Sequence, residues 1–282
     1  MHVVRSLADL STACVALRSR FGTLSLVPTM GALHAGHQAL VEVAAASGGA
    51  VAASVFVNPL QFGPHEDLSR YPRDEEGDLA KLRAWGCHLA WLPDVTTMYG
   101  PGSATTVDVA GPAEGWEADA RPGHFRGVAT VCAKLFGQVR PDRAYFGEKD
   151  WQQLQVVRRM VADLLPGLEI VAVRTVREPD GLALSSRNRF LLPHERHLAP
   201  ALYATLREVA AALAGGDPAG PVVSAARRRL QQDGFGVDYL ALVDGATLQT
   251  LGSATSGARL IAAARLGSVR LLDNVAVALR GS

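Results

Sequence analysis

The chain has 282 residues, which is enough to bury a large core, and this length favours about two domains. Its 28 lysines and arginines balance 27 aspartates and glutamates, so the formal net charge is +1. A protein that binds nucleic acid mainly through phosphates needs a broad basic field, which this composition lacks, although a local basic patch stays open. We therefore expect no nucleic-acid partner.

The three cysteines, Cys14, Cys87 and Cys132, are far apart in the sequence and lie in apolar segments. Cysteines in this arrangement are typical of reduced packing residues, which points to the cytosol. The N-terminus lacks the basic segment and long apolar run of a secretory signal, and no apolar run has the length of a membrane span. We expect a cytoplasmic protein without a membrane partner.

Short apolar runs alternate with amphipathic helical patterns in the first part of the chain. The predicted strands are residues 24–27, 50–57, 88–92 and 144–146, and the predicted helices are residues 38–46, 74–85, 128–139 and 151–164. This rhythm predicts an α/β fold with a parallel sheet that is covered on both faces. Such sheets bind ligands beyond the carboxyl ends of their strands, where several polar motifs of this chain lie.

The pattern changes after about Val176. Two helical segments, 195–213 and 221–232, are followed by predicted strands at 237–243, 258–264, 269–272 and 275–279. We expect residues 1–175 to form the sheet domain and residues 176–282 a smaller α+β domain. Residues 99–123 are rich in glycine, proline, threonine and alanine, and we expect a long surface loop there.

The loop from Pro28 to His37 sets two imidazoles three residues apart, with a glycine between them, before a predicted helix. The unpaired N–H groups and positive dipole end of a helix N-terminus suit anionic phosphates. Paired histidines are also common as surface or metal-binding residues, but no third ligand lies near in sequence. We interpret this loop as a nucleotide-binding turn.

Two further polar loops have the chemistry to bind phosphates. Lys149 follows a predicted strand and can neutralise shifting negative charge, while Asp150 is expected to cap the next helix. Ser185, Ser186 and Arg187 offer two hydroxyls and a planar guanidinium. Each loop alone is more typical of a solvated surface, so their functional interpretation depends on the other motifs.

A third group consists mainly of amides. Asn58, Gln61 and Gln153 donate and accept hydrogen bonds without titrating or attacking, which suits the orientation of a hydroxy acid. Arg121 could attract an anionic substrate. The alternatives are loop amides that are satisfied by the backbone and an ordinary surface arginine.

Seven segments in order along the chain closely resemble the pantothenate synthetase family. They are residues 28–37, 56–62, 71–73, 123–128, 146–150, 152–153 and 184–188. The histidine loop alone is shared, in looser form, by a wider nucleotidyltransferase superfamily. The resemblance implies a Rossmann-type N-terminal domain, a small C-terminal domain that closes over ATP, and a homodimer. It also implies condensation of pantoate with β-alanine that depends on ATP and Mg2+.

The resemblance implies roles for particular residues as well. His34 and His37 would contact the ATP phosphates, with His37 as the proton donor. Gln61 and Gln153 would hold pantoate, Gln61 would also serve β-alanine, and Asn58 would assist.

The implied nucleotide site extends over three loops. Its residues would be Met30, Gly31, Ala32, Leu33, His34, Ala35, Gly36, His37, Gly147, Glu148, Lys149, Asp150, Val176, Leu184, Ser185, Ser186 and Arg187. Lys149 and Arg187 would join the two histidines in catalysis. Arg121 is counted with the substrate-binding residues, and Asp78 is the candidate ligand for magnesium by its position.

These residues predict a ligase that works in two half-reactions. The pantoate carboxylate would attack the α-phosphorus of ATP, and the amine of β-alanine would then attack the acyl-adenylate. An adenylyltransferase with another acceptor would share the ATP loops but has less need of the three amides. A non-enzymatic nucleotide- or RNA-binding module is the other alternative, and the near-zero net charge speaks against RNA.

Overall fold

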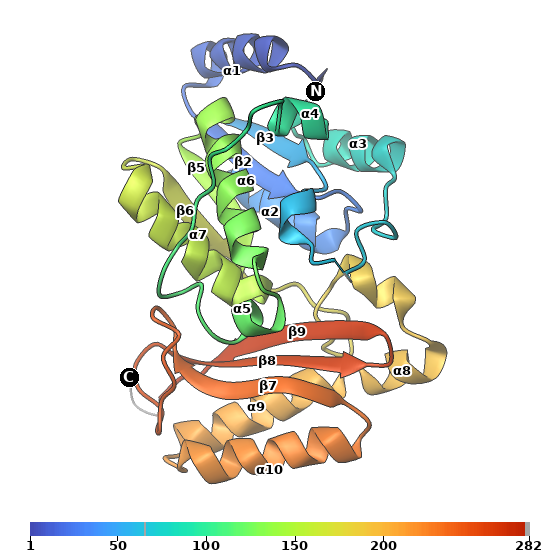
Figure 1. Ribbon diagram of the computed structural model, residues 1–282, viewed down its shortest axis with the longest axis vertical. Coiled ribbons are helices and arrows are strands. Elements are labelled where there is room, and N and C mark those ends of the chain that lie inside the picture. Colours follow the sequence, from blue (N-terminus) through green and yellow to red (C-terminus); the bar gives the residue numbers. More distant parts are fainter. Residues whose placement is uncertain (65, 280–282) are drawn as a thin grey trace.

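The computed structural model describes residues 1–64 and 66–279 and contains two sheets (Figure 1). The first is a six-stranded parallel sheet with the order β1-β4-β3-β2-β5-β6. Its strands are β1 (His2–Val4), β2 (Leu24–Thr29), β3 (Ala50–Val55), β4 (Leu89–Trp91), β5 (Arg143–Gly147) and β6 (Glu169–Val173). The strand order reverses between β2 and β5, and α/β sheets of this kind bind ligands at such a switch point.

Helices cover both faces of this sheet. One face is covered by α1 (Leu7–Phe21), α6 (His124–Val139) and α7 (Trp151–Leu164), and the other by α2 (Ala35–Ala46) and α3 (Glu75–Ala84). Side chains alternate along each strand, so Leu24 and Leu26 join the first core and Val27 joins the second. The shorter elements are η1 (Pro59–Gln61), α4 (Val95–Met98), α5 (Glu117–Ala120) and η2 (Glu148–Asp150). The α/β prediction is confirmed.

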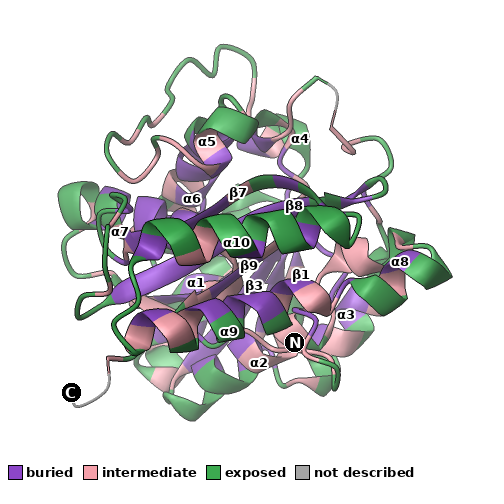
Figure 2. Cartoon of the chain, turned by 90° about the horizontal axis from the view of Figure 1, so that it is seen from below, coloured by how far each residue is buried: buried purple, intermediate pink, exposed green. Residues whose placement is uncertain are grey.

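The second part of the chain forms an antiparallel sheet with the order β7-β8-β9. Its elements are η3 (Ser186–Phe190), α8 (Pro193–Leu198), α9 (Ala201–Ala214), α10 (Ala219–Gln232), β7 (Gly236–Asp244), β8 (Ala258–Leu266) and β9 (Val269–Ala276). One face of this sheet packs against α9 and α10, and the outward face of α10 is exposed (Figure 2). The other face packs against Trp116 and Trp151 from the first part of the chain.

The structure corrects several predicted elements in the second half of the chain. The predicted helix 195–213 is two helices, α8 and α9, because Pro200 at the start of α9 lacks the N–H that a continuous helix needs. The two predicted strands at 269–272 and 275–279 are the single strand β9, which pairs with β8 along its length. The predicted loop 99–123 contains α5, whose Glu117 is buried.

The N-terminal part also differs in detail. Helix α2 begins at Ala35 rather than Gln38, so Gly36 lies in its first turn. The elements β1, α1 and β6 lie outside the predicted rhythm. The predicted packing role of the three cysteines agrees with the structure, where all three are buried and unpaired. Within residues 1–64 and 66–279, no helix has both the length and the apolar character needed to cross a membrane.

Candidate active site

A cavity of about 240 Å³ lies at the carboxyl ends of β2 and β5, beside the antiparallel sheet, and all three predicted polar loops contribute to its wall. The predicted residues on the wall are Met30, His34, Gly36, His37, Gln61, Arg121, Gly147, Lys149, Asp150, Gln153, Val176, Leu184, Ser185, Ser186 and Arg187. The remaining predicted residues are not part of the wall: Gly31, Ala32, Leu33, Ala35, Asn58, Asp78 and Glu148.

The two histidines cap the N-terminus of α2. The Nδ1 of His34 accepts a hydrogen bond from the Gly36 N–H at 3.1 Å, and the Nδ1 of His37 accepts one from the His34 N–H at 3.2 Å. A Cβ atom on residue 36 would lie 2.8 Å from the His34 ring, so this cap requires glycine. Because each Nδ1 accepts, each neutral ring carries its proton on Nε2. The helix N-terminus thus adds two imidazole donors to its own N–H groups.

Both imidazoles are neutral at neutral pH. Burial lowers the pKa of His34 to about 4, and the charge of Lys149 acts in the same direction. Burial lowers the pKa of His37 to about 3, and the neighbouring His34, whose ring centroid is 4.2 Å away, lowers it further. A bound polyanion would favour the charged form of either ring and raise both pKa values.

Asp78 stabilises the backbone of the histidine loop. Its two carboxylate oxygens accept hydrogen bonds from the N–H groups of Ala32 and Leu33, at 2.7 and 2.8 Å, and the residue is 2% exposed. Ala32 has a positive φ of 51°, so these contacts stabilise an uncommon backbone conformation. Both oxygens of Asp78 thus bind the backbone of the histidine loop, which argues against its predicted role as a magnesium ligand.

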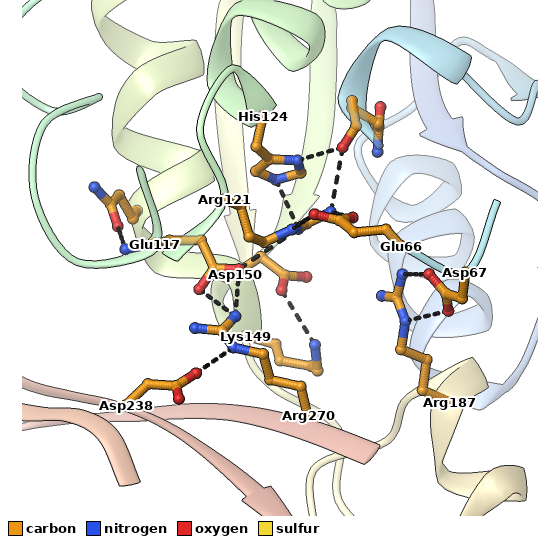
Figure 3. Close-up of polar contacts among 12 residues, drawn as sticks. Glu66, Asp67, Glu117, Arg121, His124, Lys149, Asp150, Arg187, Asp238 and Arg270 are labelled. Carbon is orange, nitrogen blue, oxygen red and sulfur yellow. Dashed lines mark hydrogen bonds and ion pairs between the residues drawn. The ribbon is translucent and has the colours of Figure 1, made fainter. Parts of the chain in front are cut away.

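Lys149 points toward the carboxylate that follows it. Its Nζ lies 3.1 Å from Asp150 Oδ1, and its side chain is only 20% exposed (Figure 3). Asp150 makes no capping hydrogen bond to α7, so the prediction of a capping aspartate was wrong. Desolvation, the largest single effect, raises the pKa of Asp150, but the charge and hydrogen bond of Lys149 and the charge of Arg187 together outweigh it and lower the pKa overall. The Asp150 carboxylate therefore remains ionised at the cavity wall.

Arg187 is held by a residue that the sequence did not indicate. Its Nε and Nη2 donate to the two oxygens of Asp67 at 2.8 and 2.9 Å (Figure 3). Ser185 fixes the turn, because its Oγ accepts the Arg187 N–H at 3.2 Å and caps η3. A wider cavity of about 660 Å³ adjoins the first, and Arg187 lines both.

The amides form a supported cluster. Gln61 lines the cavity, and its Oε1 accepts a hydrogen bond from Asn58 Nδ2 at 3.0 Å. Asn58 is 1% exposed and also donates to the Gly127 carbonyl at 3.1 Å, so it positions Gln61 from behind. The absence of a side chain at Gly127 permits its backbone to approach η1 this closely, because a Cβ there would lie 2.2 Å from the carbonyl oxygen of Leu60.

The adjacent glutamines of α7 have different surroundings. Gln152 is buried, and its Nε2 donates to the carbonyls of Pro112, Glu114 and Gly115. Gln153 lies on the wall of the cavity. The structure thus offers Gln153 to a ligand and commits Gln152 to the backbone.

Arg121 lines the cavity with its guanidinium already engaged. It donates to Glu66 at 2.9 and 2.6 Å and to the Gln61 carbonyl at 3.2 Å (Figure 3). The same carbonyl accepts a hydrogen bond from His124 Nδ1 at 2.9 Å. Burial lowers the pKa of His124 to about 4, so this ring is neutral too. Arg121 therefore fixes Gln61 and is not an unpaired anion receptor.

A buried ion pair joins the two parts of the molecule beside the cavity. Arg270 on β9 donates to both oxygens of Glu117 on α5, at 2.6 and 2.5 Å, and to Asp238 on β7 at 2.6 Å (Figure 3). Glu117 is 3% exposed. These residues were not among the predicted ones, and no local sequence signal marks a pair 153 residues apart.

The fold and site together define a Rossmann-type protein that can bind nucleotide phosphates at a histidine-capped helix N-terminus. The family model described as pantoate-beta-alanine ligase matches residues 2–276, and the chain belongs to this family. Two relatives named pantothenate synthetase, from Acidiphilium cryptum and Granulibacter bethesdensis, are 59% and 58% identical to it. The two alignments each cover 98% of this chain, and 100% and 96% of the relatives.

Solved structures agree with this assignment. A pantothenate synthetase from Thermus thermophilus superposes with a TM-score of 0.92 at 50% identity, over 98% of this chain and 99% of that one. A pantoate-beta-alanine ligase from Francisella tularensis, complexed with beta-gamma ATP and beta-alanine, superposes with a TM-score of 0.83 at 29% identity. That alignment covers 98% of this chain and 97% of the Francisella chain. The resemblance inferred from the ordered motifs is confirmed.

Proposed function

We propose that the protein condenses pantoate with β-alanine in an ATP-dependent reaction that passes through pantoyl-adenylate. One observation carries this proposal: phosphate-binding groups from three loops and two cavity-facing amides, Gln61 and Gln153, meet in one cavity. Family membership and the ligands named for the Francisella relative support the same reaction.

The first half-reaction forms the adenylate. A pantoate carboxylate oxygen attacks the α-phosphorus, the bond from that phosphorus to the bridging oxygen breaks, and pyrophosphate leaves with the bond electrons. His34 and His37 donate their Nε2–H groups to phosphate oxygens, and the triphosphate raises their pKa values. His37 can then supply a proton to the leaving group. Lys149 and Arg187 stabilise the charge that accumulates on it.

The second half-reaction forms the amide. The amine of β-alanine attacks the acyl carbon, the acyl–phosphate bond breaks, AMP leaves, and the nitrogen loses a proton. Gln61 and Gln153 orient pantoate through hydrogen bonds, and they leave its carboxylate free to react because an amide does not compete as a nucleophile. No protein nucleophile is needed in either step.

Magnesium is proposed to accompany ATP. Among residues 1–64 and 66–279 no group of three or more histidines, cysteines or carboxylates is arranged to hold a metal. Mg2+ usually keeps several waters and binds through substrate phosphates with one or two carboxylates, and the Asp150 carboxylate on the cavity wall could serve as one of these ligands. Bound in this way, the ion would neutralise charge on the phosphates.

We also propose a cytoplasmic homodimer made of a sheet domain, residues 1–175, and a smaller domain, residues 176–282, which closes over ATP. The change from a parallel to an antiparallel sheet between β6 and β7 supports the division. The buried, unpaired cysteines support a reducing compartment. Sedimentation equilibrium would test the dimer.

Exchange of labelled pyrophosphate into ATP tests the reaction. We expect exchange with pantoate and magnesium in the absence of β-alanine, because the first half-reaction is reversible on its own. Exchange without pantoate would favour an adenylyltransferase with another acceptor. An absolute need for β-alanine would exclude the two-step route, and filter binding of tRNA would reveal an RNA-binding module.

A further inference from the structure

We infer that Asn274, on β9 of the antiparallel sheet, is a positioning residue that fixes η2 (Glu148–Asp150), called the Lys149 loop below, from the other part of the molecule. The inference rests on the proposed function, because it assigns Asn274 a role in adenylate formation. Asn274 lines the cavity, yet it is only 5% exposed. It lies well outside the predicted site residues in the sequence.

The amide nitrogen of Asn274 donates hydrogen bonds to two consecutive backbone carbonyls of the Lys149 loop. Nδ2 donates to the Glu148 carbonyl at 2.8 Å and to the Lys149 carbonyl at 2.9 Å. Both N–H groups of the amide are thereby satisfied. The two carbonyls belong to the peptide groups on either side of the Lys149 Cα, so fixing both of them fixes the direction in which the Lys149 side chain leaves the backbone.

The orientation of the amide is itself set by a neighbour. Arg259 Nη1 donates to Asn274 Oδ1 at 2.8 Å, and a guanidinium can only donate. This contact distinguishes the oxygen end of the amide from the nitrogen end. Arg259 is held in turn by Glu148 at 3.2 Å and by the face of Trp151, whose ring centroid lies 3.3 Å from the guanidinium carbon.

Asp273, the residue before Asn274, binds the segment that leads to Ser185. Asp273 accepts two hydrogen bonds from Arg177, at 2.6 and 2.8 Å, and one from the Asn274 N–H at 2.7 Å. Arg177 lies in the segment that leads to Ser185. Two adjacent residues of β9 therefore hydrogen-bond to the Lys149 loop and to the segment that leads to Ser185.

The test is a double-mutant cycle measured by pantoate-dependent pyrophosphate exchange in the full chain. Asn274→Asp keeps the size of the side chain but removes both donors, and Asn274→Ala removes them without adding a charge. We expect either variant to lower the exchange rate by about 10- to 100-fold, the scale of losing support for a positioned group. In a Lys149→Ala background the same substitutions should cost almost nothing more, because the group that Asn274 positions is gone.

Trp116→Phe is the matched control. It removes one hydrogen bond between the two parts of the molecule, from Trp116 Nε1 to the Leu248 carbonyl at 3.0 Å, without touching the Lys149 loop. Exchange by this variant should stay within a fewfold of the parent. Losses that multiply in the double variant, or an equal loss in Trp116→Phe, would overturn the inference. A parent without exchange would instead reject the proposed function.

Discussion

Asp67 uses two of the five N–H donors of the Arg187 guanidinium and offsets its charge, so it competes with a nucleotide for this cation. The pair is bidentate, at 2.8 and 2.9 Å, and the two side chains are 29% and 21% exposed. Consistent with the pairing, the hydrogen bond from Arg187 outweighs desolvation and lowers the pKa of Asp67. A charge-assisted pair at this depth contributes about 1–2 kcal/mol, more than an exposed pair and less than a fully buried one.

Asp67→Asn should therefore tighten ATP binding. Removing the competing charge should make the free energy of ATP binding more favourable by about 1–2 kcal/mol, which is roughly a 5- to 30-fold lower Kd. Calorimetry with a non-hydrolysable ATP analogue and magnesium, without pantoate, measures this directly. Asp108→Asn is the control, since it removes the partner of an exposed arginine, Arg126, outside the cavity.

The gain in ATP affinity from Asp67→Asn should vanish in an Arg187→Ala background, because Asp67 then has no arginine to pair with. Unchanged or weaker ATP binding by Asp67→Asn would refute the reasoning. Weaker binding would indicate that Asp67 orients Arg187 in the complex and does not compete with the nucleotide.

Three further outcomes follow from the site. Lys149→Ala should slow single-turnover adenylate formation by about 10²- to 10³-fold with a smaller effect on ATP affinity, and a rate within a few-fold of the parent would mark it as a solvated lysine. Gln61→Ala should weaken pantoate binding and spare ATP binding when both are titrated on one preparation, and equal weakening would contradict its assignment. The pKa of His37 is lowered from 6.5 to about 3, so only the unfolded state takes up this proton as the pH falls below 6.5. The free energy of unfolding should be fully retained above that pH and decline below it by about 1.4 kcal/mol per pH unit for this residue, and urea titrations of His37→Gln should show a shallower decline. An unchanged slope would show that His37 is already charged in the folded protein.

The sequence by itself determined the parallel sheet and the loops that follow its strands. Apolar runs such as 24–27 specify buried strands through neighbours in the chain, and the cap that His34 forms on α2 involves residues within three positions. The glycine at 36 belongs to the same local unit. Interactions over so short a range leave a readable pattern, which is why the resemblance to the family was also specific.

Only the tertiary structure decided which groups support the reactive ones. Asp67 meets Arg187 across 120 residues, Arg270 meets Glu117 across 153, and the Asn274 amide meets the Lys149 carbonyl across 125. The position of Asp78 in the chain predicted that it lies near the site. The hydrogen bond that it accepts from the Leu33 N–H, however, depends on how α3 packs. Such contacts form where elements far apart in the sequence pack together, and that arrangement depends on the packing of whole sheets and helices. It leaves no periodicity in the sequence near either partner.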